Sequence, residues 1–163
     1  MIFKPKSRNK YTTDDFPCFV INGCKLNFVS QFCYLGHMLS NNLNDDDDIR
    51  RETKNLFVRT NMLISTFHHC SVNVKLTLFR SFCLCVYDTA LWRYFSATAY
   101  SKFKSAYNKC IKKMFGYTRR DGVFPELSHP MLDTIVHNSR VLFANQCQRL
   151  CNKILLWFLT IRV

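Results

Sequence analysis

Four consecutive aspartates, Asp45 to Asp48, are the densest group of potential metal ligands in the sequence. Enzymes that transfer nucleotidyl groups hold two divalent ions ~3.5–4 Å apart with such carboxylates. Neighbouring side chains of a helix point ~100° apart, so four successive aspartates do not converge on one ion. Carboxylates are also favoured at a helix N-terminus, where they meet unpaired N–H groups and the positive end of the helix dipole. The run therefore predicts a solvated acidic cluster that opens a helix, and no metal site.

A second carboxylate pair ends the segment Tyr11-Thr12-Thr13-Asp14-Asp15. The Tyr-x-Asp-Asp signature of polymerases lies on a buried hairpin between apolar flanks. This segment has one residue too many before the aspartates and lacks those flanks. We predict a loop here and no catalytic carboxylates anywhere in the chain.

Thiols and imidazoles do not form a recognisable site either. The nine cysteines are odd in number, so they cannot all pair within one chain. No Cys-x-x-Cys pair is present, and Cys83 and Cys85 would point to opposite sides of a helix. Cys33 and His37 would lie ~13 Å apart in a strand, too far for a nucleophile and its base. We predict buried free thiols, surface histidines, no metal or other cofactor, and an intracellular, reducing compartment.

Positive charge is the strongest functional signal in the sequence. The 163 residues contain 23 Lys and Arg against 11 Asp and Glu, a formal net charge of +12. An excess of this size on a small domain favours a polyanionic partner, nucleic acid first and an anionic membrane surface second. The longest apolar run, Ile154 to Ile161, has eight residues, whereas a membrane span needs ~18–20. We therefore predict no membrane span.

The charge is concentrated between Thr89 and Arg120, where eight basic residues occur without an acidic one. The lysines alternate with aromatic residues, a combination that suits salt-dependent binding of phosphates and stacking on bases. At their spacing of four, Phe103 and Tyr107 are predicted to be core, so the basic side chains are the functional candidates. The predicted nucleic-acid-binding residues are Lys102, Lys104, Lys109, Lys112, Lys113, Arg119 and Arg120.

The elements that must position these residues begin with a β lead-in over residues 1–40. Asn22-Gly23 separates two apolar runs, and this dipeptide favours a type I′ hairpin because both residues tolerate positive φ. A third strand is predicted from Phe32 to Leu39, with Gly36 inside it as a bulge or a close backbone approach.

Helical periodicity follows the aspartate run. The first predicted helix extends from Ile49 to Phe67. A second, from about Val72 to Tyr94, is apolar nearly all round and is predicted to be the buried centre of a bundle. A third repeats its apolar residues at three and four from Phe103 to Met114 and ends at Gly116. A last helix begins near Met131.

No linker divides the chain, so one α+β unit, mainly α, is predicted. It comprises the small hairpin with a third strand, followed by a three- to four-helix bundle over residues 45–150. The apolar tail over residues 151–163 is not assigned to either part.

The order of these segments resembles the region that follows the catalytic palm in reverse transcriptases of LINE-type (non-LTR) retrotransposons. Each motif is short, but five of them occur in the order of the family, over residues 1–150. The first is Ile2 to Lys6, which looks like the strand after the catalytic hairpin. The second, similar to the primer-grip hairpin, is Phe19 to Leu26 with Phe32 to His37, and the third, which resembles the opening of the first thumb helix, is Asp48 to Glu52. The fourth, which looks like the next helix, is Val74 to Ser81 with Tyr87 to Trp92, and the fifth, similar to the helix after that, is Tyr107 to Gly116.

The resemblance implies a thumb-like bundle that holds an RNA–DNA hybrid by its phosphates. Primer-grip-like residues Phe32, Tyr34, Leu35 and Gly36 would place the primer end. The family's fingers and palm, with the aspartates that bind Mg²⁺, lie upstream of the matched region. We therefore expect a palm-less fragment with no polymerase activity of its own, for which a palm and fingers polypeptide is a further partner.

Three alternatives remain open at this point. A domesticated basic module would bind nucleic acid for a use of its own. A non-functional remnant of a decayed element would expose Phe19, Ile21, Phe28 and Tyr34 and would aggregate. A membrane-surface protein would use the basic helix and the apolar tail on anionic lipid.

Overall fold

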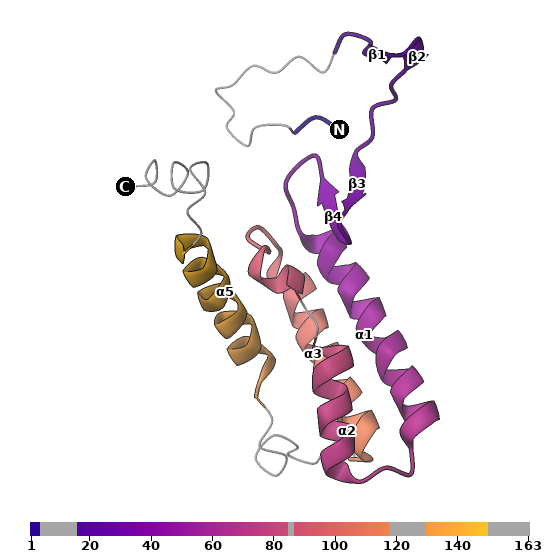
Figure 1. The fold of residues 1–163 in the computed structure, drawn as a ribbon, viewed down its shortest axis with the longest axis vertical. Helices are drawn as coiled ribbons and strands as arrows, with labels where there is room; N and C mark the ends of the chain where they lie inside the picture. The colour runs from indigo at the N-terminus through magenta and orange to yellow at the C-terminus, as the bar shows by residue number, and fades with distance from the viewer. Residues whose placement is uncertain (4–15, 85–86, 118–129, 150–163) are drawn as a thin grey trace.

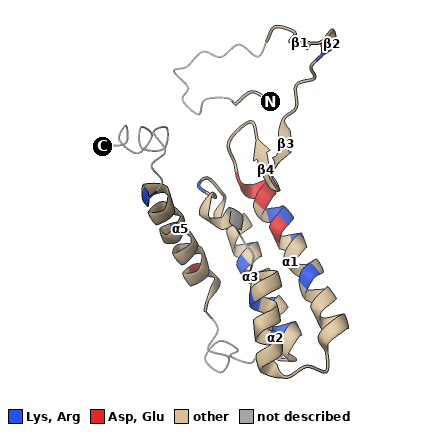
Figure 2. Cartoon of the chain, in the orientation of Figure 1, with Lys and Arg blue, Asp and Glu red and all other residues tan. Residues whose placement is uncertain are grey.

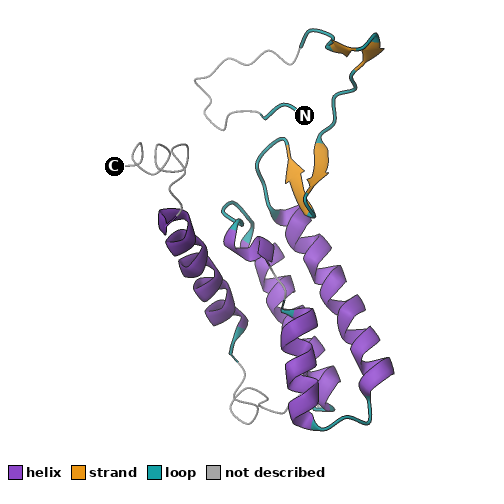
Figure 3. Cartoon of the chain, in the orientation of Figure 1, coloured by secondary structure: helices purple, strands orange, loops and turns teal. Residues whose placement is uncertain are grey.

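The computed structural model describes residues 1–3, 16–84, 87–117 and 130–149. In this part of the chain, two small antiparallel hairpins precede the helices α1, α2, α3 and α5 (Figures 1 and 3). The fold is therefore α+β and mainly α, as predicted. The segment Tyr11 to Asp15, the basic residues Arg119 and Arg120, and the tail over 151–163 lie outside the described residues.

The first hairpin is the one that Asn22-Gly23 predicts. Its strands are β1 (Val20–Ile21) and β2 (Cys24–Lys25), paired antiparallel. Asn22 and Gly23 have φ angles of 52° and 78°, as both central residues of a type I′ turn require. Every residue from 17 to 36 is exposed, so this hairpin stands clear of the bundle.

The prediction of a single third strand from Phe32 to Leu39 is wrong. Two strands, β3 (Gln31–Tyr34) and β4 (His37–Ser40), form a second antiparallel hairpin. The chain reverses at Leu35 and Gly36, whose φ angles are 49° and 85°. Glycine adopts such an angle freely, whereas leucine rarely does, so a turn at this point contradicts the usual residue preferences.

α1 (Asp46–Phe67) follows the second hairpin directly. Four residues at helical spacing within the predicted helix, Ile49, Leu56, Thr60 and Leu63, are buried. The Thr60 hydroxyl donates to the Leu56 carbonyl oxygen at 2.7 Å, which satisfies this polar group inside the core.

α2 (Val72–Leu78) is much shorter than the helix predicted from Val72 to Tyr94. It continues into a π-helical turn (Phe79–Cys83), and a 3₁₀ turn (Tyr87–Ala90) follows. No residue of α2 is buried, and burial begins only in the π-helical turn. The run that is apolar all round is therefore divided among short segments, and the prediction of a central buried helix is wrong.

α3 (Ala97–Phe115) agrees with the prediction. Ser96 caps it, since its hydroxyl accepts a hydrogen bond from the Ala99 amide at 3.1 Å, and Gly116 ends it with a φ of 74°. All six residues of the predicted stripe are buried: Phe103, Ala106, Tyr107, Cys110, Ile111 and Met114.

α5 (Leu132–Arg149) packs only through its first half. Leu132 and Val136 are buried, whereas Leu142 and Phe143 further along are 62% and 42% exposed. The helix packs on the 3₁₀ turn, and its Asp133 side chain bonds Tyr100 and Lys104 of α3. Figure 1 shows it at one side of the bundle. The second half of α5 therefore does not pack into the bundle, although the bundle is predicted to extend to residue 150.

α1 and α3 lie side by side and run in the same direction. At one end, the Ser96 amide donates to Asp46 Oδ1 at 2.7 Å, and near the other end Lys113 Nζ donates to Asn61 Oδ1 at 2.7 Å. The packing of α1 on α3 is the largest helix–helix contact among the described residues. None of the described helices combines the length and apolar character needed to cross a bilayer.

Candidate functional site

The aspartate run connects the second hairpin to the bundle instead of facing solvent. Asp48 is fully buried. Its Oδ1 accepts hydrogen bonds from the Met38 amide at 2.9 Å and from Arg51 Nε at 2.8 Å. Its Oδ2 accepts from Trp92 Nε1 at 2.7 Å and lies 3.0 Å from His37 Nδ1. The prediction of a solvated cluster is wrong for this residue, because β4, α1 and the segment before α3 enclose it.

The neighbouring aspartates bind the segment that leads into α3. Asp45 Oδ2 accepts from the amides of Arg93 and Tyr94 at 2.7 and 2.8 Å. Asp46 accepts from the Ser96 amide as described above. The carboxylates point in different directions, as helix geometry predicts, and each has donors of its own. Among the described residues, no three side chains of His, Cys, Asp or Glu are placed to hold a metal ion.

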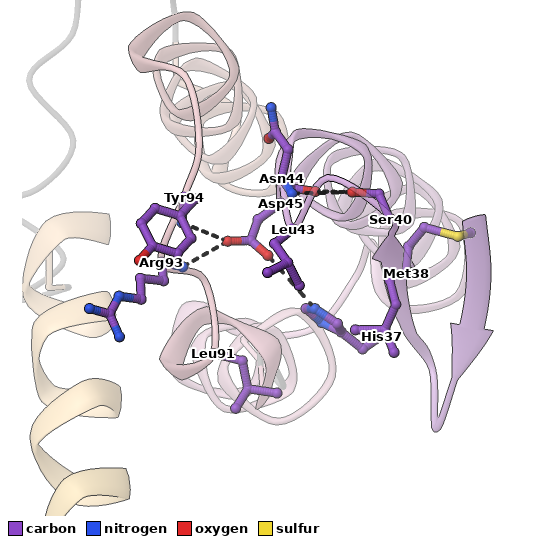
Figure 4. A pocket seen from close by; sticks show the side chains of 10 residues that line it. His37, Met38, Ser40, Leu43, Asn44, Asp45, Leu91, Arg93 and Tyr94 are labelled. Carbon is purple, nitrogen blue, oxygen red and sulfur yellow. Dashed lines mark hydrogen bonds and ion pairs between the residues drawn. The ribbon is translucent and has the colours of Figure 1, made fainter. Parts of the chain in front are cut away.

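A cavity of about 320 Å³ lies beside Asp45 (Figure 4). Leu43, Leu91 and Tyr94 supply apolar walls, and His37 lines it from the second hairpin. The Asp45 carboxylate, at its edge, is already occupied by the two backbone amides, so the cavity offers no free acidic group. Its walls separate the hairpin from the segment before α3.

Cationic side chains follow one side of the α1–α3 pair, and we call them the basic strip. Lys102, Lys109 and Lys113 are spaced i, i+7 and i+11 on α3, which places them on one face of the helix. On α1, Arg50 and Lys54 are one turn apart.

One shared cavity and one hydrogen bond relate the two halves of the basic strip. Arg50 and Lys102, together with Asp46, line a cavity of about 200 Å³ between the helices. Lys113 bonds Asn61 of α1 further along, as described above. Figure 2 shows acidic residues at the start of α1 and basic residues spaced down the helices. Of the strip residues, Arg50 pairs with Asp47, and no described acidic side chain forms an ion pair with the four lysines.

The other predicted basic residues do not join the strip. Lys104 points toward α5 and pairs with Asp133. Lys112 precedes Lys113 by one position and so lies about 100° away around the helix. The structure therefore brings together three of the five predicted lysines that it describes. Arg50 and Lys54 were not predicted, although their i, i+4 spacing on a predicted helix was a usable signal.

The aromatic residues near the lysines are structural. The Tyr100 hydroxyl donates to Asp133 at 2.9 Å, and its ring stacks on Phe95 with 5.4 Å between centroids. Burial and the hydrogen bond to Asp133 raise the pKa of Tyr100 to about 12. The buried Tyr107, whose pKa burial raises, donates to the Pro130 carbonyl oxygen at 2.9 Å. These rings are held in place and do not form a stacking platform for bases.

The thiols are less buried than predicted. Of the seven described cysteines, only Cys83 and Cys110 are buried. Burial raises the pKa of the Cys110 thiol, which lowers its nucleophilicity. Cys18, Cys24 and Cys33 are exposed because the hairpins that carry them do not pack on the bundle.

The primer-grip-like residues gather at the tip of the second hairpin. Phe32 and Tyr34 lie on β3 and are exposed, Leu35 is 88% exposed, and Gly36 completes the turn. The hairpin is fixed to α1 through the Met38 amide, which donates to Asp48. The candidate site therefore has two parts, the hairpin tip and the basic strip, which meet at the aspartate run.

No model of a known protein family, no curated protein and no solved structure matches the chain. The charge and geometry of the described residues are therefore the ground on which a function is proposed.

Proposed function

We propose that this chain is a primer-grip and thumb-like unit, related to LINE-type non-LTR reverse transcriptases, that binds an RNA–DNA hybrid through its phosphates. The observation that carries the proposal is the basic strip, in which α1 and α3 align five cationic side chains. Four of the five are lysines, and these four form no ion pair with a described acidic side chain. Lysines and arginines attract backbone phosphates without reading bases. The proposed binding is therefore independent of sequence.

The dimensions of the strip suit one strand of a duplex. From Lys102 to Lys113, α3 rises about 16 Å. This length equals the axial rise of about five nucleotides of one strand. Four to five phosphates would then lie within reach of the five cations.

The hairpin tip supports the second half of the proposal. Leu35 combines a positive φ with nearly complete exposure, so it gains little from folding to offset its strained backbone. Backbone strain that burial does not compensate points to a role in contact with a partner. In the proposed function, this tip packs against the primer end beside the strand on the strip.

Salt dependence tests the proposal directly. Binding of a labelled RNA–DNA hybrid should weaken with a slope of log K against log salt of about −4, since each phosphate contact contributes about −0.9. Charge reversal of Lys102 and Lys109 together should reduce the slope by about 2 and weaken binding at least ~30-fold at 0.1 M salt. Arg149→Glu, on the exposed end of α5, is the control and should bind like the wild type. Equal effects of strip and control substitutions would contradict the proposal.

We propose no catalytic role for the chain by itself. In the reverse transcriptases that the chain resembles, the carboxylates that bind Mg²⁺ belong to the palm. A palm and fingers polypeptide is therefore the proposed partner. The proposed compartment is intracellular and reducing, as the odd number of cysteines in the sequence predicts. Metal-dependent nucleotide incorporation by the purified chain would overturn the first of these proposals.

The exposed lead-in favours one alternative, a remnant without present function. Phe19, Ile21 and Phe28 are each at least half exposed, and apolar surface of this kind promotes aggregation when no partner covers it. A purified chain that melts cooperatively and binds the hybrid supports the proposed function. An aggregated chain that does not bind supports the alternative.

A further inference from the structure

A cavity of about 240 Å³ lies at the end of the bundle opposite the aspartate run. Two lysines and one histidine from three segments line it. His68 follows α1, Lys75 comes from α2 and Lys113 comes from the end of α3. None of the residues that line the cavity is acidic, so it is a concentration of positive charge.

Two of these groups retain donors for a ligand. Lys113 uses one of its three N–H donors on Asn61 Oδ1. Lys75 forms no ion pair with a described acidic side chain. Cations gathered around one cavity repel one another, and a bound anion removes that repulsion. An oxyanion that accepts several hydrogen bonds, such as phosphate, matches this set of donors.

The remaining walls of the cavity are apolar. Ile64 and Phe67 contribute from α1, and Phe115 contributes from α3. Inorganic phosphate alone would leave this surface without a contact. A phosphate that carries a flat, weakly polar group, such as a base, would use both the cations and the apolar walls.

We infer that this cavity binds a nucleotide, with the phosphate on Lys75, Lys113 and His68 and the base against the apolar wall. Lys113 belongs to both the basic strip and the cavity, so a strand on the strip would lead into it. Binding of a nucleotide of that strand rests on the proposed function. Binding of a free nucleotide does not rest on it.

Titration with small ligands tests the cavity itself. AMP, adenosine and inorganic phosphate are added separately to the full chain, and the backbone amide signals of Gly116 and His68 are followed by NMR. AMP is expected to bind with a dissociation constant of about 1 mM, and adenosine to bind at least ten-fold more weakly. Lys75→Gln should weaken AMP binding about ten-fold, whereas Lys25→Gln should leave it unchanged. Absence of AMP binding, or equal AMP binding by both variants, overturns the inference.

Binding of the RNA–DNA hybrid separates the two sources of the nucleotide. If Lys75→Gln lowers the salt slope by about 0.9, the cavity takes a phosphate of the strand. If AMP binds but the slope is unchanged, the cavity takes a free nucleotide. If AMP fails to bind while the strip variants still weaken hybrid binding, the inference fails and the proposed function stands. A thermal melt confirms that Lys75→Gln is folded, and Lys113→Gln provides a second variant in the same cavity.

Discussion

At the scale of single residues, the buried carboxylate of Asp48 joins β4, α1 and the segment before α3. Its carboxylate is withdrawn from water but receives hydrogen bonds from a backbone amide, an indole and a guanidinium. A buried charge is tolerated only when it is paired in this way. The sequence marks the aspartate run as unusual, but Trp92, its partner, lies 44 positions away. Local patterns therefore predict a helix start here and miss the burial.

Asp48→Asn should destabilise the fold strongly. The amide keeps the size of the side chain, but it removes the charge and directs an NH₂ group at groups that are themselves donors. We expect a loss of about 3 kcal/mol in the free energy of unfolding, measured by urea denaturation. Asp47→Asn, at a partly exposed position with a surface partner, is the matched control and should lose less than about 1 kcal/mol. Similar losses in both variants would show that Asp48 is not the centre of the network.

Tyr100 makes stability depend on alkaline pH. Its pKa rises from 10.0 to about 12 on folding, so the folded state holds the phenol proton more tightly than the unfolded state. This contribution is complete below pH 10 and is lost as the pH rises from 10 to 12. Because the ring is partly exposed, we expect about 1 kcal/mol. The stability difference between wild type and Tyr100→Phe should shrink by that amount between pH 9.5 and 12, and a constant difference would contradict the assignment.

The same contact predicts behaviour in acid. Hydrogen bonds from Lys104 and Tyr100 lower the pKa of Asp133 below its model-compound value of 3.8. Its contribution is present above pH 3.8 and is lost as the pH falls through the lower folded value. Asp133→Asn should therefore lose less stability than the wild type on acidification below pH 4. The difference should stay under about 1 kcal/mol because the side chain is half exposed.

At the scale of elements, local periodicity predicts α3 and fails for α2. The stripe of α3 is decided by residues three and four apart, and the Ser96 and Gly116 caps fix its ends. In the region of α2, a tertiary contact decides burial, because full burial begins at the π-helical turn, which packs on α1. Sequence rules likewise predict the hairpin at Asn22-Gly23 and miss the one at Leu35-Gly36, where a leucine occupies a conformation that asparagine or glycine prefers.

Leu35→Asn separates the stability of the second hairpin from its proposed role. Asparagine tolerates the positive φ, so the variant should gain about 1 kcal/mol in unfolding free energy. Under the proposed function, it should also weaken hybrid binding, because the exposed apolar tip is lost. Leu43→Asn is the matched control, since Leu43 also has a positive φ, 55°, but lies outside the hairpin. This control should gain less stability, because Leu43 is 44% exposed and lines the cavity beside Asp45, and it should bind the hybrid like the wild type.

At the scale of the whole molecule, two parts differ in how they are held. The bundle has a continuous buried core that joins α1, the π-helical turn, α3 and the start of α5. None of the described residues of the lead-in joins this core, and residues 17–36 are exposed throughout. The fold class follows from the change of period along the sequence. The side-by-side placement of α1 and α3, which creates the basic strip, does not, because nothing local indicates which helices become neighbours.

The wide sequence separation of the aspartate contacts has a consequence for folding during synthesis. Asp45 and Asp46 bind amides 48 to 50 positions later in the chain. At about 5–20 residues per second, the ribosome takes several seconds to produce those partners. Through that interval, four adjacent carboxylates repel one another, and α3, which packs along α1, has not yet been made. The arrival of residues 92–96 should then be the event that closes the bundle, so substitutions there should slow folding more than they speed unfolding.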